Sequence, residues 1–338
     1  MLNAFETVET PTTPRGSRPN RRRRIALTVV AVLALVTVGG AAAYVTFLNH
    51  TVTSNVKHEA LLPTPAPGEP APPKLAEAKD AQNFLVIGSD SRPGEGSRGR
   101  SDVIVLVHIN NDRSRVDLVH FPRDLYVSVP GHGKDKINAA YAYGGAPLLV
   151  STVQDLVQAP IDHVSIIGFE GFKAMTDAVG GVDVFAEESS TSPSGSVVKG
   201  MNHVNGDQAL AFVRERKQLS EGDISRGKRQ QAFIKALMLK GLSKDVLLNP
   251  ITFAGFADAA TKNLTVDNGF SMSDMRSEAL QMRNLRGRDI YFTTAPFTGF
   301  GTSPVGGSIE ILDKAKIKQL SDALQRDDMA SYTVAASK

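Results

Sequence analysis

The sequence predicts an α/β fold: a three-layer α/β/α domain with a central mixed sheet, preceded by one transmembrane helix. Short apolar runs alternate with amphipathic stretches between Asn83 and Ala186, as in a sheet that helices cover on both faces. The run Val103 to Val107 has no polar alternation, so we expect a central strand buried on both sides. Residues 25–48 carry no charged side chain, and about 20 apolar residues are enough to cross a bilayer as a helix.

The N-terminal part predicts a membrane anchor. Residues 1–24 form a polar tail ending in Arg21–Arg24, and basic residues beside an apolar span favour the cytoplasmic side. We expect a single-pass protein of the cell membrane with its N-terminus in the cytoplasm and its catalytic domain outside. The alternative is a signal peptide cleaved near Ala41–Ala43, but the apolar run is longer than such peptides usually have. Residues 49–80 are rich in proline and predict an extended extracytoplasmic linker.

The folded domain is expected over residues 81–326. Strands are predicted at residues 83–88, 102–110 and 115–121, and a helical stretch follows Lys136. Next come a strand at 163–169, a helix at 171–179 and, after a break at Gly180–Gly181, a strand at 182–186. Later segments are predicted to be mostly helical, with one more strand at 289–297. Residues 327–338 are predicted to form a flexible C-terminal tail.

Composition excludes several kinds of site. The chain of 338 residues has no cysteine, which rules out thiol nucleophiles, zinc–cysteine centres and disulfides. Its seven histidines are scattered, and none pairs at the spacing of metal ligands. A formal net charge of +3 does not indicate a nucleic-acid-binding protein unless the basic residues gather on one face. We therefore expect no nucleic-acid partner.

Two aspartates form the most informative acidic pair. Asp90 follows the first predicted strand and Asp102 opens the second. If these strands are neighbours in the sheet, both carboxylates come to one sheet edge. Two hard oxygen ligands with room for water and a substrate phosphate suit Mg²⁺. The alternative is that each aspartate only forms a turn or a cap.

Cationic side chains accompany this pair along the chain. Several arginines together can neutralise a pyrophosphate, because each guanidinium binds phosphate oxygens in bidentate fashion. If the segment around Glu215 is extended, Arg214 and Arg216 point to the same side. The alternative is a set of solvated surface arginines, and for Arg229 the two interpretations are equally supported. The set comprises Arg92, Arg100, Arg123, Lys136, Arg214, Arg216, Arg226 and Arg229.

The segment after Gly222 predicts a helix that Asp223 caps and Gly241 ends. Arg226 and Gln230 are four residues apart, so they share one face of this helix. That face continues with apolar side chains: Phe233, Ile234, Leu237 and Met238. The pattern favours an amphiphilic ligand, with its phosphate at the arginines and its lipid tail along the apolar stripe. The alternative is an ordinary amphipathic helix packed on the sheet.

These stretches together resemble the LytR-CpsA-Psr family of cell-wall glycopolymer ligases. They occur in the family's order between Asn83 and Phe233: NFLVIGSDSR, RSDVIVLVHIN, FPRDLYV, KINAAYAYGG, GGVDV and FVRERKQLSEGDISRGKRQQAF. The resemblance implies an α/β/α domain that holds a polyprenyl phosphate in an apolar cavity, with the pyrophosphate and Mg²⁺ at its mouth. It implies Asp90 and Asp102 as Mg²⁺ ligands. It implies catalytic roles for both aspartates, Arg100, Arg123 and Arg216, and pyrophosphate or lipid binding by Arg92, Lys136, Arg214, Arg226 and Gln230.

The resemblance also implies the reaction and the partners. A peptidoglycan hydroxyl attacks the sugar-proximal phosphorus of a glycopolymer linked to polyprenyl pyrophosphate, and polyprenyl phosphate leaves. The glycopolymer is of the teichoic acid, capsular polysaccharide or arabinogalactan type. A polyprenyl pyrophosphate hydrolase or a protein that only binds the lipid carrier would use the same motifs. A membrane-bound transcriptional regulator is a further alternative, but residues 1–24 contain no helix-turn-helix pattern.

Overall fold

The computed structural model describes residues 39–40, 42–64, 72–89 and 101–336. The chain divides into residues 1–49 and residues 50–338. In the first unit, residues 39–40 and 42–49 are helical. Over the described ranges, no helix combines the length and the apolar character needed to cross a membrane. Residues 25–38 of the predicted span lie outside the described residues.

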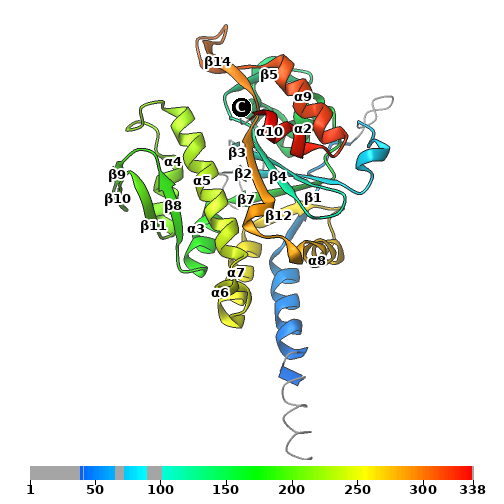
Figure 1. Cartoon of the computed structure of the whole chain (residues 1–338), viewed down its shortest axis with the longest axis vertical. Helices are drawn as coiled ribbons and strands as arrows, with labels where there is room; N and C mark the ends of the chain where they lie inside the picture. The colour runs from blue at the N-terminus through cyan, green and yellow to red at the C-terminus, as the bar shows by residue number, and fades with distance from the viewer. Residues whose placement is uncertain (1–38, 41, 65–71, 90–100, 337–338) are drawn as a thin grey trace, which may run out of the picture. The chain divides into compact units, whose positions relative to one another are not determined.

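The second unit is built on a seven-stranded mixed sheet (Figure 1). β2 pairs antiparallel with β3 and β3 antiparallel with β4, whereas β7 runs parallel to β2 and β13 parallel to β4. The carboxyl ends of β2, β4, β7 and β13 therefore meet at one edge of the sheet. In spatial order the strands are β1 (Lys57–Glu59), β12 (Leu264–Asp267), β7 (His163–Gly168), β2 (Gln82–Ser89), β3 (Ser101–Ile109), β4 (Val116–His120) and β13 (Ile290–Thr294).

Helices cover both faces of the sheet, as the sequence predicted. Side chains alternate along a strand, so Leu85 and Ile87 of β2 join the core that α2 (Ile137–Val157), α9 (Lys314–Gln325) and α10 (Met329–Ala336) complete. Phe84 points to the opposite face, towards α5 (Asp223–Gly241) and α8 (Met272–Gln281). The run in β3 predicted to be buried on both sides is buried or nearly so. The three-layer arrangement follows from these two cores.

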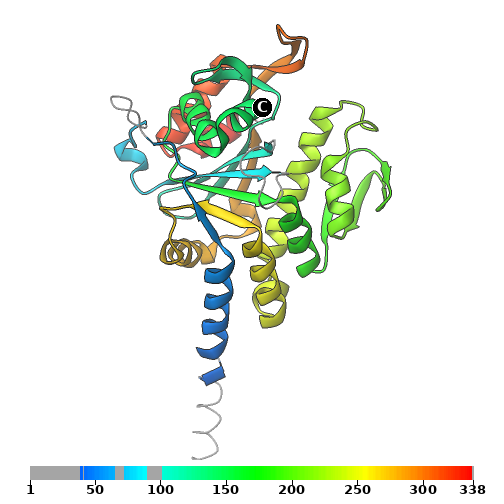
Figure 2. The same ribbon diagram turned by 180° about the vertical axis from the view of Figure 1, so that it is seen from behind.

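A third core packs beside the sheet. Phe212 and Phe233 are its largest fully buried side chains, and α3 (Phe169–Ala178), α4 (Gly206–Arg214) and α7 (Pro250–Lys262) contribute to it together with α5. Figure 2 shows these helices from behind. Smaller elements complete the fold: η1 (Ala76–Ala78), β8 (Val182–Ala186), β9 (Ser190–Ser192), β10 (Gly195–Val197), β11 (Gly200–Val204), α6 (Lys244–Leu247), η3 (Met282–Asn284) and η4 (Gly287–Asp289).

A four-stranded sheet that the sequence did not predict lies above the main one. Its order is β14-β15-β5-β6, and β15 runs parallel to β5 while the other pairs are antiparallel. Its strands are short, and β14 contains two glycines, which weaken the strand pattern in the sequence. The bounds are β5 (Leu125–Val129), β6 (Gly133–Lys136), β14 (Phe297–Thr302) and β15 (Ser308–Leu312).

The linker predicted at 49–80 is wrong in its first part. Residues 50–55 are helical, β1 pairs with β12 at the edge of the main sheet, and Val56 and Leu61 are buried. The prolines that suggest a spacer begin only at Pro63. The folded unit therefore starts well before residue 81.

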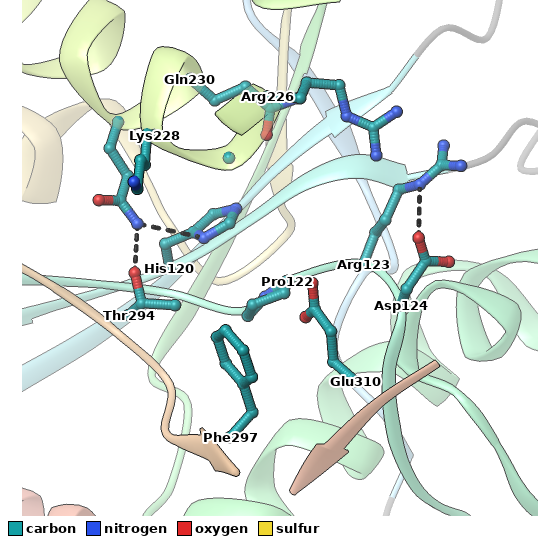
Figure 3. Close-up of a pocket in the computed structure, with 12 residues that line it drawn as sticks. His120, Pro122, Arg123, Asp124, Arg226, Lys228, Gln230, Thr294, Phe297 and Glu310 are labelled. Atoms are coloured by element: carbon teal, nitrogen blue, oxygen red, sulfur yellow. Dashed lines mark hydrogen bonds and ion pairs between the residues drawn. The ribbon is translucent and has the colours of Figure 1, made fainter. Parts of the chain in front are cut away.

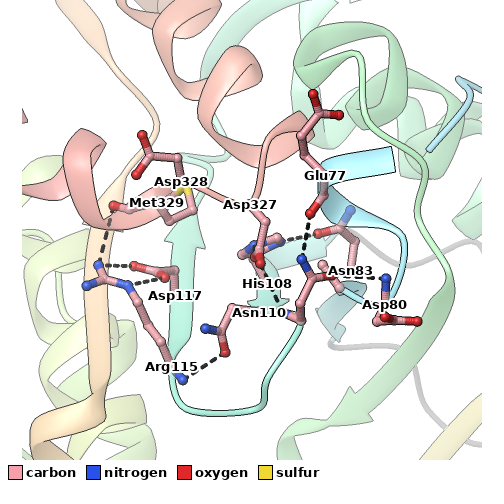
Figure 4. A network of polar contacts seen from close by, with 12 residues as sticks. Glu77, Asp80, Asn83, His108, Asn110, Arg115, Asp117, Asp327, Asp328 and Met329 are labelled. Carbon is pink, nitrogen blue, oxygen red and sulfur yellow. Dashed lines mark hydrogen bonds and ion pairs between the residues drawn. The ribbon is translucent and has the colours of Figure 1, made fainter. Parts of the chain in front are cut away.

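The C-terminal tail is also ordered over most of its length. Residues 329–336 form α10, whose Met329 and Tyr332 are buried against α9 and the sheet. A polar network fixes the turn before α10 (Figure 4). A carboxylate oxygen of Asp327 lies 2.9 Å from Nε2 of buried His108, and the other accepts a hydrogen bond from the Asn111 amide. Nδ1 of His108 lies 2.8 Å from Oδ1 of Asn83. Because this network is buried, the segment is part of the domain and not a flexible tail.

Candidate functional site

The carboxyl edge of the main sheet gathers the polar residues of the site. β4 ends at His120, and β13 places Thr294 directly beside it. β2 ends at Ser89, which pairs with Ser101 at the start of β3. In open α/β sheets, ligands bind outside the carboxyl ends of the strands. This edge is therefore the expected place for a substrate.

The pairing on which the acidic pair depended is confirmed. β2 and β3 are antiparallel neighbours with Gly88 opposite Val103, so the chain leaves and re-enters the sheet at this edge. Asp90, Arg92 and Arg100 themselves lie outside the described residues, and of Asp102 only the backbone, in β3, is described. Within the described part of the chain, no three His, Cys, Asp or Glu side chains gather as metal ligands. Mg²⁺ binding by the two aspartates stays a prediction.

A cavity of about 240 Å³ opens beside this edge (Figure 3). Three segments far apart in the chain form it: the end of β4 with the loop after it, the first turns of α5, and the stretch from the end of β13 through β14 to β15. Three of the side chains that line it are cationic. The lining consists of His120, Pro122, Arg123, Asp124, Arg226, Gly227, Lys228, Gln230, Gln231, Thr294, Phe297 and Glu310.

The loop after β4 places Arg123 in the cavity wall, as the sequence predicted. Nε of Arg123 lies 3.5 Å from a carboxylate oxygen of Asp124, and Nζ of Lys136 lies 2.8 Å from the other. Glu310 of β15 donates its backbone N–H to the carbonyl of Asp124. Lys136 is not among the residues that line the cavity. It neutralises Asp124 and holds the loop that presents Arg123.

The start of α5 supplies the other cations. Arg226, Lys228 and Gln230 all line the cavity, and the N-terminal end of a helix favours a nearby anion. The helix ends at Gly241 as predicted, but Asp223 is its first residue, and Gly222, with φ of 55°, occupies the cap position. The predicted cap is therefore wrong by one residue, because glycine adopts the left-handed backbone needed there without strain.

Lys228 remains positively charged at the cavity wall. Its Nζ lies 3.1 Å from carboxylate oxygens of both Glu187 and Glu221. Hydrogen bonds to these two carboxylates raise the pKa of Lys228. Lys228 is therefore a cation that is already ion-paired with two acidic side chains. Arg123 and Arg226 are the other two cations of the cavity wall, and their charge is permanent.

His120 is a buried member of the site that sequence reasoning missed. Burial first, and the positive charge of Arg226 second, lower the pKa of His120 from 6.5 to about 4. The imidazole is therefore neutral at neutral pH. The side-chain nitrogen of Gln231 lies 3.4 Å from Nδ1 of His120 and also donates to Oγ1 of Thr294. An amide nitrogen only donates, so this contact fits the tautomer with its proton on Nε2.

Two predicted arginines lie away from the cavity. The segment around Arg214 is not extended: Arg214 ends helix α4, Glu215 caps it, and Arg216 follows as an exposed residue. The guanidinium of Arg214 stacks on the ring of Phe169, 4.3 Å from its centroid. The expectation that the two arginines share one side of a strand is therefore wrong. Neither is among the residues that line the cavity.

Arg229 has a structural role. Its side chain is buried, donates to the Glu188 carbonyl and to Oγ of Ser190, and stacks over the Phe212 ring. These contacts hold α5 against the β8–β9 segment and use the guanidinium within the fold. Of the two interpretations that the sequence left open, the solvated surface arginine is wrong, because the side chain is buried.

A small apolar pocket adjoins the cationic cavity. Gln230 lines both, so the two meet at this residue of α5. The apolar pocket measures about 10 Å³, less than a buried water needs. A lipid chain enters it only after the side chains around it move apart. Its other lining residues are Gly88, Val103, Ile167, Phe169, Phe172, Val213 and Ile234.

Gly88 lets β2 and β3 approach closely at this pocket. A methyl group added there would lie 2.8 Å from Cβ of Val103, closer than real Cβ contacts. The glycine therefore keeps the floor of the pocket free of side chain. Its position directly after the apolar run of β2 is the only trace of this role in the sequence.

Several lining residues could not be found from the sequence. Thr294, Phe297 and Glu310 come from strands near the C-terminus, and only the parallel pairing of β13 with β4 and of β15 with β5 brings them to the site. Gln231 was visible only as the neighbour of Gln230, and Lys228 as one cation in the run RGKR. His120 stands two residues before Pro122 in a segment that otherwise reads as a strand.

Comparison with known proteins identifies the family. Residues 43–326 match the model of the LytR_cpsA_psr family. The chain belongs to the LytR-CpsA-Psr family. The family resemblance of the sequence is thereby confirmed, and the matched range begins before the proline-rich segment, in agreement with the helical residues and β1 at the start of the second unit.

Named relatives and solved structures agree with this membership. The chain is 33% identical over 269 residues to the polyisoprenyl-teichoic acid--peptidoglycan teichoic acid transferase TagU of Bacillus mycoides, covering 77% of this chain and 86% of TagU. It is 30% identical over 282 residues to the cell wall biosynthesis protein LcpA of Corynebacterium glutamicum, covering 70% of this chain and 54% of LcpA.

Two solved structures of the family superimpose on this fold. B. subtilis TagV does so with a TM-score of 0.64 at 26% identity, covering 74% of this chain and 98% of TagV. A structure of TagT bound to LI-WTA gives a TM-score of 0.58 at 27% identity, covering 75% of this chain and 93% of TagT. The mixed α/β fold is therefore shared with family members of known structure.

Proposed function

We propose that this protein is a Mg²⁺-dependent phosphotransferase that moves a glycopolymer from a polyprenyl pyrophosphate carrier to peptidoglycan. One observation carries the proposal: a cationic cavity and an apolar pocket meet at Gln230 on the sheet edge. A lipid pyrophosphate consists of an anionic pyrophosphate group, which suits the cationic cavity, joined to an apolar chain, which suits the apolar pocket. Of the relatives of this chain, TagU is named a teichoic acid transferase and LcpA a cell wall biosynthesis protein.

The cations of the cavity neutralise the pyrophosphate. Arg123 and Arg226 approach from different elements, the loop after β4 and the start of α5, so a phosphate between them meets charge from both sides (Figure 3). Preorganised charge of this kind stabilises phosphoryl transfer without further reorganisation. Neutral His120 adds a hydrogen-bond donor, the Nε2–H group, without adding charge.

In the proposed reaction, a peptidoglycan hydroxyl oxygen attacks the sugar-proximal phosphorus. A new O–P bond forms, the bond from that phosphorus to the bridging oxygen breaks, and polyprenyl phosphate leaves with the electron pair. The hydroxyl proton passes to a carboxylate at the sheet edge, for which Asp90 and Asp102 are the sequence-predicted groups. No ATP is needed, because the pyrophosphate link is already activated.

The sheet edge fits a hard cation beside the pyrophosphate. The Oγ of Ser101 is buried there and has no hydrogen-bond partner in the described part of the chain. Asp124 is already paired with Lys136, and the sequence-predicted Asp90 and Asp102 are the residues that would hold Mg²⁺. When bound, Mg²⁺ would offset the negative charge of the pyrophosphate. We propose that residues 25–48 anchor the protein in the cell membrane, with its N-terminus in the cytoplasm.

The proposal is tested with the full chain in proteoliposomes. The reaction contains a polyprenyl-pyrophosphate-linked glycan, Mg²⁺ and peptidoglycan fragments, and mass spectrometry identifies the products. Glycan joined to peptidoglycan through a phosphodiester, lost in Asp102→Ala and after chelation of Mg²⁺, supports the transferase. Release of glycan phosphate alone indicates a hydrolase. Binding of the carrier without either product indicates a carrier-binding protein.

A matched pair of arginine variants links the reaction to the cavity. Arg226→Ala removes a cation from the cavity wall, and we expect product formation to fall strongly. Arg288→Ala removes an exposed arginine whose side chain is 86% exposed and which lies at the opposite end of β13. Equal activity of the two variants would show that the reaction takes place elsewhere.

A further inference from the structure

The turn between α6 and α7 presents a cluster of exposed apolar side chains. Leu247, Leu248 and Ile251 are exposed to 48%, 77% and 85%, and Leu242 just before α6 to 43%. Soluble surfaces carry single exposed apolar residues without consequence, but several side by side indicate an interaction site. We call these four residues the α6–α7 cluster.

The cluster is held outward by ordered structure. Ser243 caps α6 by accepting a hydrogen bond from the Val246 amide, and Asn249 caps α7 by accepting from the Ile251 and Thr252 amides. Val246 itself is buried, with 1% exposure, and packs α6 against the third core, which contains Phe212 and Phe233. The apolar side chains are therefore displayed by two capped helices and not by an irregular loop.

Connectivity places this cluster at the end of the domain where the chain enters it. The helical residues 50–55 lead into β1, α7 leads into β12, and β1 and β12 are parallel neighbours. The two helices therefore run side by side in the same direction, and Nδ2 of Asn55 contacts Asp258 and Thr261 of α7 at 3.0 and 3.2 Å. Figures 1 and 2 both show α7 beside the helix that leads into β1.

Helix geometry then relates the cluster to the predicted anchor. Ile251 precedes Asp258 by seven residues, a rise of about 10 Å. Counting back by the same rise from Asn55 passes His50, where the folded unit begins. The uncharged apolar run of the sequence ends at Leu48, two residues earlier. The chain therefore enters the folded unit near the N-terminal end of α7.

Helix α5 connects the same end of the domain to the site. Gln230 lies between the two pockets, Ile234 lines the apolar one, and Leu242 follows the end of α5 in the cluster. The rise from Gln230 to Leu242 is about 18 Å. At its end α5 packs so tightly on α7 that a methyl group at Gly241 would lie 3.0 Å from the Phe256 ring.

We propose that the α6–α7 cluster is a second membrane contact, inserted at the boundary between lipid headgroups and acyl chains. The proposal rests on the membrane anchoring proposed above. Exposed Lys244 lies next to the cluster and meets anionic headgroups, as basic residues of interfacial helices do. The contact fixes the orientation of α5 relative to the bilayer, so that a carrier lipid reaches the apolar pocket from the membrane.

The cysteine-free chain allows a direct test. Single variants Leu248→Cys and Ile251→Cys carry a fluorophore in full-length protein reconstituted into vesicles of anionic and zwitterionic phospholipid, with spin-labelled lipids as quenchers. Val305→Cys is the matched control, since Val305 is 91% exposed in the β14–β15 turn. Val36→Cys reports the predicted anchor. We expect quenching at the cluster roughly threefold or more above that at Val305.

The outcomes separate the two proposals. Quenching at Val36 with none above the control at Leu248 and Ile251 overturns the membrane contact and leaves anchoring intact. No quenching at any of the positions overturns both. Disulfide formation between unlabelled Leu248→Cys chains, with no quenching in the labelled protein, shows that a second copy covers the cluster, which also overturns the contact. Leu248→Asp is expected to slow transfer from carrier in bilayers but not from carrier dispersed in detergent.

Discussion

The buried imidazole of His120 makes the stability of the domain depend on pH in a defined window. The pKa of His120 lies at about 4, because the side chain is buried and Arg226 is nearby. In the unfolded chain the same group has a pKa near 6.5. Between these two values the unfolded chain binds one proton more than the folded chain. The free energy of unfolding must therefore fall as the pH falls through this window.

The magnitude follows from the two pKa values. At 1.36 kcal/mol per pKa unit, the difference between 6.5 and about 4 corresponds to about 3 kcal/mol. The penalty is absent above pH 7, grows below pH 6.5 and is complete near pH 4. A change of this size is a large part of the net stability of an ordinary domain.

The assay compares the wild type with His120→Gln. Glutamine keeps a hydrogen-bonding group near Gln231 and Thr294 but cannot gain a proton in this range. Urea unfolding of both proteins in the same detergent, from pH 7.5 to pH 4.5, cancels the titrations that they share. We expect His120→Gln to lose about 2 kcal/mol less than the wild type over this range. NMR of the imidazole signal that disappears in the variant gives the pKa directly.

A control and a clear refutation accompany this test. His203→Gln, which replaces a histidine whose side chain is 61% exposed, is unfolded alongside as the control variant. If His120→Gln and the wild type lose stability equally with falling pH, the imidazole is not buried in neutral form. His120 would then not line the cavity as a neutral group.

Three further predictions concern other parts of the molecule. Arg226→Lys should restore part of the transfer activity that Arg226→Ala loses, by a factor of about 10, because lysine keeps the charge without the planar fork; product formation in proteoliposomes measures this. Asp327→Ala should lower the free energy of unfolding by about 2 kcal/mol by leaving Nε2 of buried His108 without its partner, as seen by urea unfolding, and Asp327→Asn should lower it less. Gly88→Ala should cost about 1–3 kcal/mol through its clash with Val103 and weaken binding of polyprenyl phosphate in a calorimetric titration.

The sequence was sufficient where the chemistry is local. The strands β2 and β3 contain long apolar runs that only a covered sheet can bury, and the pairing of β2 with β3 followed from their closeness in the chain. Arg123, Arg226 and Gln230 were found because each belongs to a short motif whose backbone conformation is set nearby. The family was found from the order of these motifs.

The remaining features depend on contacts between distant segments. His120, Thr294 and Glu310 become neighbours only through the parallel pairings of β13 and β15, which have no local signature. The roles of Arg214 and Arg229 could not be assigned from residue type. An arginine that stacks on a phenylalanine ring and an arginine that binds phosphate look the same in the sequence, and only the fold distinguishes them. Mg²⁺, the polyprenyl carrier and the membrane anchor stay predictions.

The wall of the cavity is shared between the earliest and the latest parts of the folded chain. The loop at Arg123 and the strand of Glu310 are separated by most of the domain, yet both border the same cavity. A chain that emerges N-terminus first can form β2, β3 and β4 early, but the cavity stays open on one side until β13, β14 and β15 have joined. A prematurely terminated chain would keep much of the central sheet and still lack a closed substrate site.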